Sequence, residues 1–196
     1  MKPRPRSGDR GTSSHILDIA EGLVQSRGFN GFSYADIAAA LAISKPALYY
    51  HFPSKAELGV ALIRRYEQRF FDALSAIGDR DAPARLERYA SLYAGVLREG
   101  RMCLCGMLAA EYSTLSEPMQ QSVIHFSDRN EEWLSGVLTQ GQRERTLAFA
   151  GTPRERAHMI ISCLEGAMLV ARLYGDVDMF QTTASSLLAG LSTSAG

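Results

Sequence analysis

Residues 14–62 constrain the fold more than any other part of this 196-residue chain, because they hold three short amphipathic helical patterns separated by turn signals. The first pattern places Ile16, Ala20 and Val24 on one apolar stripe. It ends at Arg27 and Gly28, where glycine tolerates the left-handed backbone of a helix stop. A compact, exposed third helix after two others is typical of a module that enters a DNA groove. We therefore expect this stretch to bind double-stranded DNA.

The second and third patterns each begin at a serine. Ser33 precedes Asp36 by three residues, so the two side chains can form a capping box for a helix of about two turns. Ser44 is the predicted N-cap of the third helix. Pro46 lies in the first turn of that helix, where its missing N–H costs little.

The third helix has one buried side and one exposed side. Leu48 and Phe52 are four residues apart and can face inward, which turns their neighbours outward. Lys45 could donate to guanine O6 or N7, and Pro46 or Ala47 could touch a thymine methyl group. The residues expected to contact DNA are Ser33, Tyr34, Ser44, Lys45, Pro46, Ala47, Tyr49, Tyr50, His51 and Lys55.

Part of this set suits the phosphate backbone rather than the bases. Residues 49–51 and Lys55 are placed to contact phosphate oxygens, which fixes register without reading sequence. The helix starts at Ser33 and Ser54 also offer free N–H groups to phosphates. The histidine at position 51 could instead cap the helix or pack beside Phe52.

At these residues the chain resembles the tetracycline-repressor family of bacterial transcription regulators. The shared signature runs from Gly28-Phe29, through the capped helix opening at Ser33, to the segment LYYHFPSK at residues 48–55. The resemblance is specific over roughly the first third of the chain. The turn between the second and third helices departs from the family, which usually has glycine where this chain has Ala42. If that turn needs a positive φ, alanine costs about 1 kcal/mol there.

Beyond Pro53 the chain reads as helix after helix, and no alternating run of β-branched residues competes. The further helical patterns lie at residues 54–77, 86–100, 107–114, 116–138, 152–171 and 180–191. We therefore predict an all-α fold of about nine helices. Its predicted parts are a flexible basic arm at 1–11, a three-helix helix-turn-helix DNA-binding domain at 12–53, and a helical effector-binding and dimerisation domain at 54–196.

Composition and charge agree with a regulator that binds nucleic acid. Hydrophobic residues make up 46% of the chain, which can bury a core, yet no apolar run reaches the 18 or so residues needed to cross a bilayer. The N-terminus has no apolar stretch behind its charges, so we expect a cytoplasmic protein without a membrane partner. Residues 1–55 hold seven Lys and Arg against four Asp and Glu, while the whole chain has no net charge. Lys2, Arg4, Arg6 and Arg10 form a basic arm that could reach a neighbouring groove or simply be solvated.

One recognition helix reads too few bases to find an operator, so such proteins normally dimerise on two half-sites. The resemblance implies that the last two helices pair with their copies as a four-helix bundle, and Gly166, Ala167 and Ala171 would allow a close approach. It also implies a ligand pocket enclosed by the fourth to eighth helices. The expected lining is Phe70, Tyr89, Tyr93, Met102, Cys103, Met107, Glu111, Phe126 and Trp133. Its aromatic character indicates an apolar or aromatic effector.

The segment 101–111 also supports a second interpretation. A thiolate at Cys103, favoured by Arg101, could sense an electrophile or oxidant, with Cys105 or Cys163 as the resolving thiol. The cysteines could equally be small buried apolar residues. Cys103 and Cys105 cannot point the same way in a regular helix, so a bridge to Cys163 is sterically easier than one between them. No metal site is expected, because the C-x-C pair lacks a second ligand pair.

Three classes of function remain. The sequence favours a repressor released from a palindromic operator by a small ligand, and the alternatives are a thiol-sensing repressor or an effector-independent architectural factor. An enzyme is not expected, because the chain has no Gly-rich phosphate loop, no H-E-x-x-H and no G-x-S-x-G, and its four histidines are scattered. For the same reasons no cofactor is expected.

Overall fold

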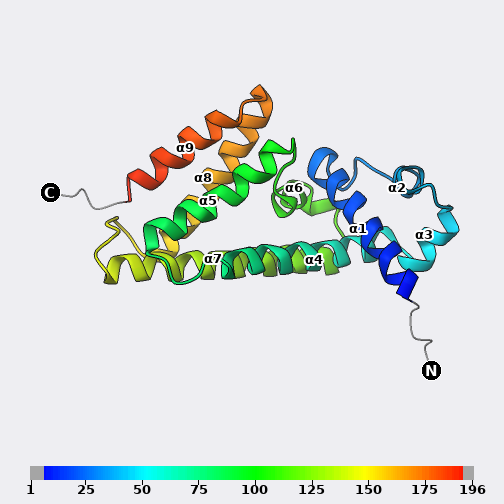
Figure 1. Cartoon of the computed structure of the whole chain (residues 1–196), viewed down its shortest axis with the longest axis horizontal. Helices are drawn as coiled ribbons and strands as arrows, with labels where there is room; N and C mark the ends of the chain where they lie inside the picture. Colours follow the sequence, from blue (N-terminus) through cyan, green and yellow to red (C-terminus); the bar gives the residue numbers. More distant parts are fainter. Residues whose placement is uncertain (1–6, 192–196) are drawn as a thin grey trace. The chain divides into compact units, whose positions relative to one another are not determined.

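The structure, a computed structural model, describes residues 7–191, which contain nine α-helices, one short 3₁₀ helix and no β-strand (Figure 1). The elements are α1 (Ser7–Arg27), α2 (Tyr34–Leu41), α3 (Lys45–His51), α4 (Lys55–Ser75), α5 (Ala82–Arg98), α6 (Leu104–Ala110), η1 (Tyr112–Thr114), α7 (Glu117–Arg143), α8 (Pro153–Tyr174) and α9 (Val177–Ala189). The predicted all-α class is confirmed.

The chain divides into two compact units. The first contains the residues up to Gln68 together with Leu104–Val123, and the second contains Arg69–Cys103 together with the chain from Ile124 onward. The long helices α4 and α7 therefore contribute residues to both units.

Helix α1 begins before the predicted start of the first domain. Residues 7–11 were expected in a flexible arm, but the backbone is helical from Ser7. Periodicity could not detect these turns because residues 7–14 contain no large apolar side chain. Lys2, Arg4 and Arg6 of the expected arm lie outside the described residues.

The first unit is built around the apolar stripe of α1. Ile16, Ala20 and Val24 are fully buried, and so are Ile37 of α2 and Leu48 of α3. Because each short helix buries only one side, the opposite sides of α2 and α3 remain exposed.

The helix boundaries in the first unit have the expected local causes. Gly28 adopts φ 84° immediately after α1. Ser33 and Asp36 form the predicted capping box of α2, and the Ser44 hydroxyl accepts a hydrogen bond from Ala47 N at the start of α3. Ala42 caps the C-terminus of α2 in the left-handed region, with φ 52° and ψ 38°. Alanine therefore occupies the positive-φ turn at which the family usually has glycine.

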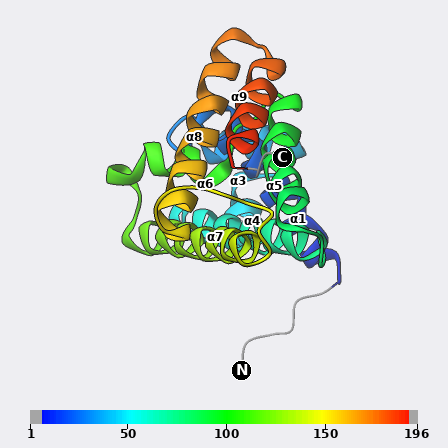
Figure 2. The same ribbon diagram turned by 90° about the vertical axis from the view of Figure 1, so that its left-hand side faces the viewer.

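In the second unit, α8 and α9 pack against each other and against α5 (Figures 1 and 2). Thr152 and Glu155 form the predicted capping box of α8, with Pro153 in its first turn. Gly175 ends α8 at φ 66°, and Asp176 caps α9 directly afterwards. This short connection makes α8 and α9 neighbours.

Helix α6 was predicted at residues 107–114 but lies at Leu104–Ala110, followed by η1. Its buried residues are Leu104, Cys105 and Leu108, so its apolar side begins three residues before the predicted start. Glycine is a weak helix former, yet the helix includes Gly106, because Leu104 and Cys105 before it pack their side chains into the core.

Helix α8 is long and apolar enough to cross a membrane by length and composition alone. Its most apolar 18-residue window has a mean hydropathy of 1.3, although only 28% of that window is buried. Glu165 and Arg172 interrupt this stretch, so the sequence has no uninterrupted apolar run of that length. Ile160, Leu164 and Met168 are completely buried, so one side of α8 belongs to the core of its unit.

Candidate functional site

Helix α3 presents the side chains expected to meet DNA around one buried anchor. Leu48 is fully buried, whereas Lys45 and Pro46 are exposed and Ala47 is partly exposed. Proline near the helix start fixes the backbone without losing an internal hydrogen bond. The N-terminal turn of α3 is therefore open to a base edge, as a recognition helix requires.

Two tyrosines extend this exposed surface. Tyr49 is 51% exposed and Tyr50 is 72% exposed, which is unusual for large aromatic side chains. The Tyr49 ring lies 4.9 Å from the Tyr34 ring, and the Tyr50 ring meets His51 edge-on at 5.3 Å. Both hydroxyl groups belong to side chains held by neighbouring rings, so they suit contacts with phosphate oxygens.

Tyr34, predicted to contact DNA, instead supports the module from inside. Its side chain is buried, and its hydroxyl donates a hydrogen bond of 2.8 Å to the carbonyl of Phe52. Burial, the main cause, raises the pKa of Tyr34 to about 12, with smaller contributions from Tyr49 and Glu57. Its place on the buried side of α2, three residues before Ile37, was the signal for this role.

Ser33 and Ser44 serve first as helix caps. The Ser33 side chain accepts from Ala35 N and donates to Asp36, and both serines are exposed. Hydrogen bonds from Ser33 lower the pKa of Asp36. This carboxylate lies at the start of α2, so it reduces the attraction of that helix end for phosphate.

Lys55, also predicted to contact phosphate, points into the protein. Its ammonium donates hydrogen bonds to the carbonyls of Phe29 and Phe32, at 2.6 and 2.5 Å, and lies over both rings. Burial lowers the pKa of Lys55, while Glu111 opposes that shift. The lysine holds the turn between α1 and α2, a role that its position after the recognition helix does not reveal.

Glu111, predicted to line the ligand pocket, contacts the same turn. Its carboxylate accepts hydrogen bonds from the backbone N–H groups of Phe29 and Asn30, and the Asn30 side chain donates to Thr114. Met107 of α6 belongs to the same unit. Glu111 therefore belongs to the first unit rather than to the aromatic cluster described next.

Five of the predicted ligand residues gather in the second unit, and they are Phe70, Tyr89, Tyr93, Phe126 and Trp133. We call this group the aromatic cluster. Phe70 lies edge-on to Phe126 at 5.2 Å, and Tyr89 stacks on Trp133 at 5.6 Å with an interplanar angle of 20°. Helices α4, α5 and α7 each contribute to it.

A buried amide completes the aromatic cluster. The hydroxyl groups of Tyr89 and Tyr93 lie 3.0 Å apart, and Asn130 accepts from Tyr89 at 3.2 Å and donates to Tyr93 at 3.4 Å. Burial raises the pKa of both tyrosines, so both stay neutral. Sequence reasoning missed Asn130, although a polar residue four positions after Phe126 on an apolar helix side was the available signal.

The thiol of Cys103 donates to the carboxyl group of Glu165, whose pKa is raised mainly by burial. Met102 and Cys103 are both buried, and none of the three cysteines forms a disulfide bond. Arg101, expected to favour the thiolate, forms an ion pair with Glu99. Glu165 is the second residue that sequence reasoning missed, because it lies more than 60 positions from Cys103.

Among the described residues, no group of three or more His, Cys, Asp and Glu side chains could hold a metal ion.

Two family models match the chain. Residues 16–62 match "Bacterial regulatory proteins, tetR family", and residues 82–187 match "Tetracyclin repressor-like, C-terminal domain". The first match spans the capped helices and the recognition helix, and the second spans α5 to most of α9.

Similar proteins include transcriptional repressors and nucleoid occlusion factors. The chain is 27% identical over 168 residues to the HTH-type transcriptional repressor NemR of Escherichia coli, covering 83% of this chain and 84% of NemR. It is 27% identical over 164 residues to the nucleoid occlusion factor SlmA of a Marinomonas strain, covering 82% of each chain. A TetR-family regulator from Agrobacterium tumefaciens superimposes with a TM-score of 0.91 at 28% identity, covering 94% of this chain and all of the other.

Proposed function

This chain belongs to the tetR family of bacterial regulatory proteins and is a DNA-binding transcriptional regulator, and we propose that it is a cytoplasmic repressor whose homodimer holds a palindromic operator until a small apolar or aromatic molecule binds. The observation that carries the proposal is α3, which exposes Lys45, Tyr49 and Tyr50 around the buried Leu48. Two exposed tyrosines add no stability to a helix that faces only water, whereas on a DNA-binding helix their hydroxyl groups can bind phosphates.

The exposed residues of α3 divide into two roles. Lys45, Pro46 and Ala47 form the first turn, which enters the major groove, and Lys45 donates to guanine O6 or N7. Residues 49–51 contact phosphate oxygens and fix the register. Ser33 and Ser44 keep their capping roles, and the exposed N-terminal ends of α2 and α3 approach the phosphate backbone of the DNA.

The homodimer forms through α8. Five large apolar side chains of α8 are exposed, namely Met159, Leu169, Val170, Leu173 and Tyr174. Leu173 is 78% exposed, so a monomer would expose an apolar surface that promotes aggregation. A second copy of α8 covers it, and this pairing explains why only 28% of the most apolar window of α8 is buried better than a membrane does.

The effector acts at the aromatic cluster. Its rings surround the buried group of Tyr89, Tyr93 and Asn130, which can exchange mutual hydrogen bonds for bonds to a ligand. The ligand lowers operator affinity only if it binds the non-DNA-binding conformer more tightly.

The thiol-sensing alternative draws on the buried Cys103. Its thiol donates to a carboxyl group, and the reactive form of cysteine is the thiolate. This environment favours a reversible ligand over a covalent trigger. A Cys103→Ser protein that no longer releases DNA on treatment with N-ethylmaleimide, with Cys105→Ser releasing normally, would reverse that preference.

Selection of DNA from a random pool by the purified protein tests the proposal. We expect two inverted half-sites about one helical turn, or a multiple of it, apart. Compounds that release the protein from that operator should lose their effect in Asn130→Leu but not in Gln142→Leu, an exposed control on the same helix. Failure to enrich any sequence would refute specific binding, and an operator complex that no apolar or aromatic compound weakens would favour an effector-independent factor.

A further inference from the structure

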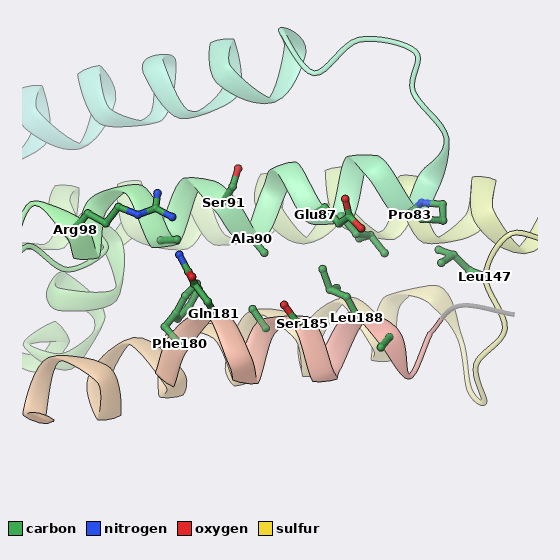
Figure 3. A pocket seen from close by; sticks show the side chains of 14 residues that line it. Pro83, Glu87, Ala90, Ser91, Arg98, Leu147, Phe180, Gln181, Ser185 and Leu188 are labelled. Atoms are coloured by element: carbon green, nitrogen blue, oxygen red, sulfur yellow. The ribbon is translucent and has the colours of Figure 1, made fainter. Parts of the chain in front are cut away.

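A groove separate from the aromatic cluster lies between α5 and α9 (Figure 3). Its volume is about 470 Å³, within the range of about 300–1,000 Å³ that small-molecule sites occupy. None of the nine predicted ligand residues lines it. At about 100° per residue, Ala94 and Arg98 project roughly 160° around α5 from Tyr89, so one helix serves both regions.

The floor of the groove is apolar and formed by small side chains. Ala90 and Ala94 of α5 and Ala184 of α9 all line it, together with Phe180 and Leu188 along α9. The three alanines are at least 94% buried, yet no larger side chain fills the space above them. The groove therefore offers an apolar surface that an acyl or aryl group could cover.

The two ends of the groove carry opposite charges. Arg98 lies at the end occupied by Phe180 and Gln181, and Glu87 lies toward the other end (Figure 3). Arg98 lies eleven positions after Glu87 on α5, which is about 16 Å along the helix. Among residues 7–191, no ion pair or hydrogen bond engages the Arg98 guanidinium, so its five donors are open to a ligand.

We propose that this groove binds an aliphatic monocarboxylate, with the carboxylate on Arg98 and the hydrocarbon chain over Ala90, Ala94 and Ala184. A guanidinium pairs with a carboxylate through two parallel hydrogen bonds. The side-chain amide of Gln181 lies at the same end and can donate to the same group. Glu87 repels a second negative charge, so the groove selects a monocarboxylate over a dicarboxylate of equal length.

Octanoate titrated into the full-length protein with ¹³C-labelled alanine methyl groups tests the proposal. We expect octanoate to shift the methyl signals of Ala90, Ala94 and Ala184, and octan-1-ol and octanedioate to bind at least tenfold more weakly. Arg98→Gln should weaken octanoate about tenfold, because it removes a charge-assisted pair. Arg88→Gln, an exposed arginine of α5 outside the groove, should change nothing.

A second pair of variants blocks the groove itself. Ser185→Phe places a ring in the groove and should abolish the shifts, whereas Ser186→Phe places the same ring on the exposed surface of α9 outside the groove and should leave them. Equal binding of octanoate and octan-1-ol, or octanoate shifts unchanged by Arg98→Gln, would overturn the proposal. Methyl shifts that follow protein concentration and ignore octanoate would also overturn it, and would mean that another copy of the chain covers the groove.

Discussion

Glu111 accepts a hydrogen bond of 2.5 Å from the backbone N–H of Phe29, across 82 residues of sequence. Gly28 beside it has φ 84°, and a Cβ there would come within 2.7 Å of the carboxylate. Lys55 holds the carbonyl of Phe29. The turn before α2 is thus fixed by two opposite charges that come from neither α1 nor α2.

Glu111→Ala should lower the free energy of unfolding by about 1–3 kcal/mol, because it leaves the half-buried Phe29 N–H without an acceptor. Urea denaturation measures this loss. Glu132→Ala removes an exposed carboxylate and should change stability by no more than about 0.5 kcal/mol. Equal effects of the two changes would mean that Glu111 does not hold the turn.

Ala42→Gly should stabilise the protein by about 1 kcal/mol, because glycine adopts φ 52° without the strain that alanine has there. Ala40→Gly is the matched control two residues earlier. Ala40 is exposed inside α2, where glycine should destabilise by about 1 kcal/mol. If thermal or urea unfolding shows that both variants change the free energy of unfolding in the same direction, the assigned left-handed turn at Ala42 is contradicted.

These residues show what local sequence can and cannot predict. The caps at Ser33 and Ser44 and the buried Leu48 depend on neighbours three or four positions away, so spacing predicts them. The roles of Lys55 and Glu111 depend on contacts across 26 and 82 residues, which spacing does not encode.

The same distinction holds for the ligand region. Periodicity predicted the separate helices that carry the aromatic residues, the family resemblance implied a pocket among those helices, and the structure brings five of the aromatic residues together. Asn130 was missed because a single buried amide does not alter that periodicity. The groove at Ala184 was missed because alanine has no chemistry that marks it in a sequence; only the pairing of α5 with α9 creates the space.

Glu165→Gln should make stability less dependent on pH. Burial raises the pKa of Glu165 above 4.5, so the folded state holds this proton more tightly than the unfolded state does. The resulting stability is present below about pH 4.5 and is lost as pH rises through the folded pKa. The advantage of Glu165→Gln over the parent should therefore grow with pH in urea denaturation. A stability advantage that is constant from pH 4.5 to 8 would contradict a raised pKa of Glu165 in the folded protein.

Leu173→Glu should convert the dimer to monomers, because it places a charge at the most exposed apolar side chain of α8. Sedimentation velocity measures the change, and Leu173→Met at the same position should remain dimeric. Two variants with the same oligomeric state would show that α8 does not form the interface.

The most direct test of sequence-specific binding compares Lys45→Ala with Tyr49→Phe on the selected operator and on each of its single base-pair variants. We predict that Lys45→Ala loses the preference at one position of each half-site by about 1–3 kcal/mol, whereas Tyr49→Phe weakens binding to all sequences alike. The same uniform loss from both changes would contradict an α3 that reads bases through Lys45.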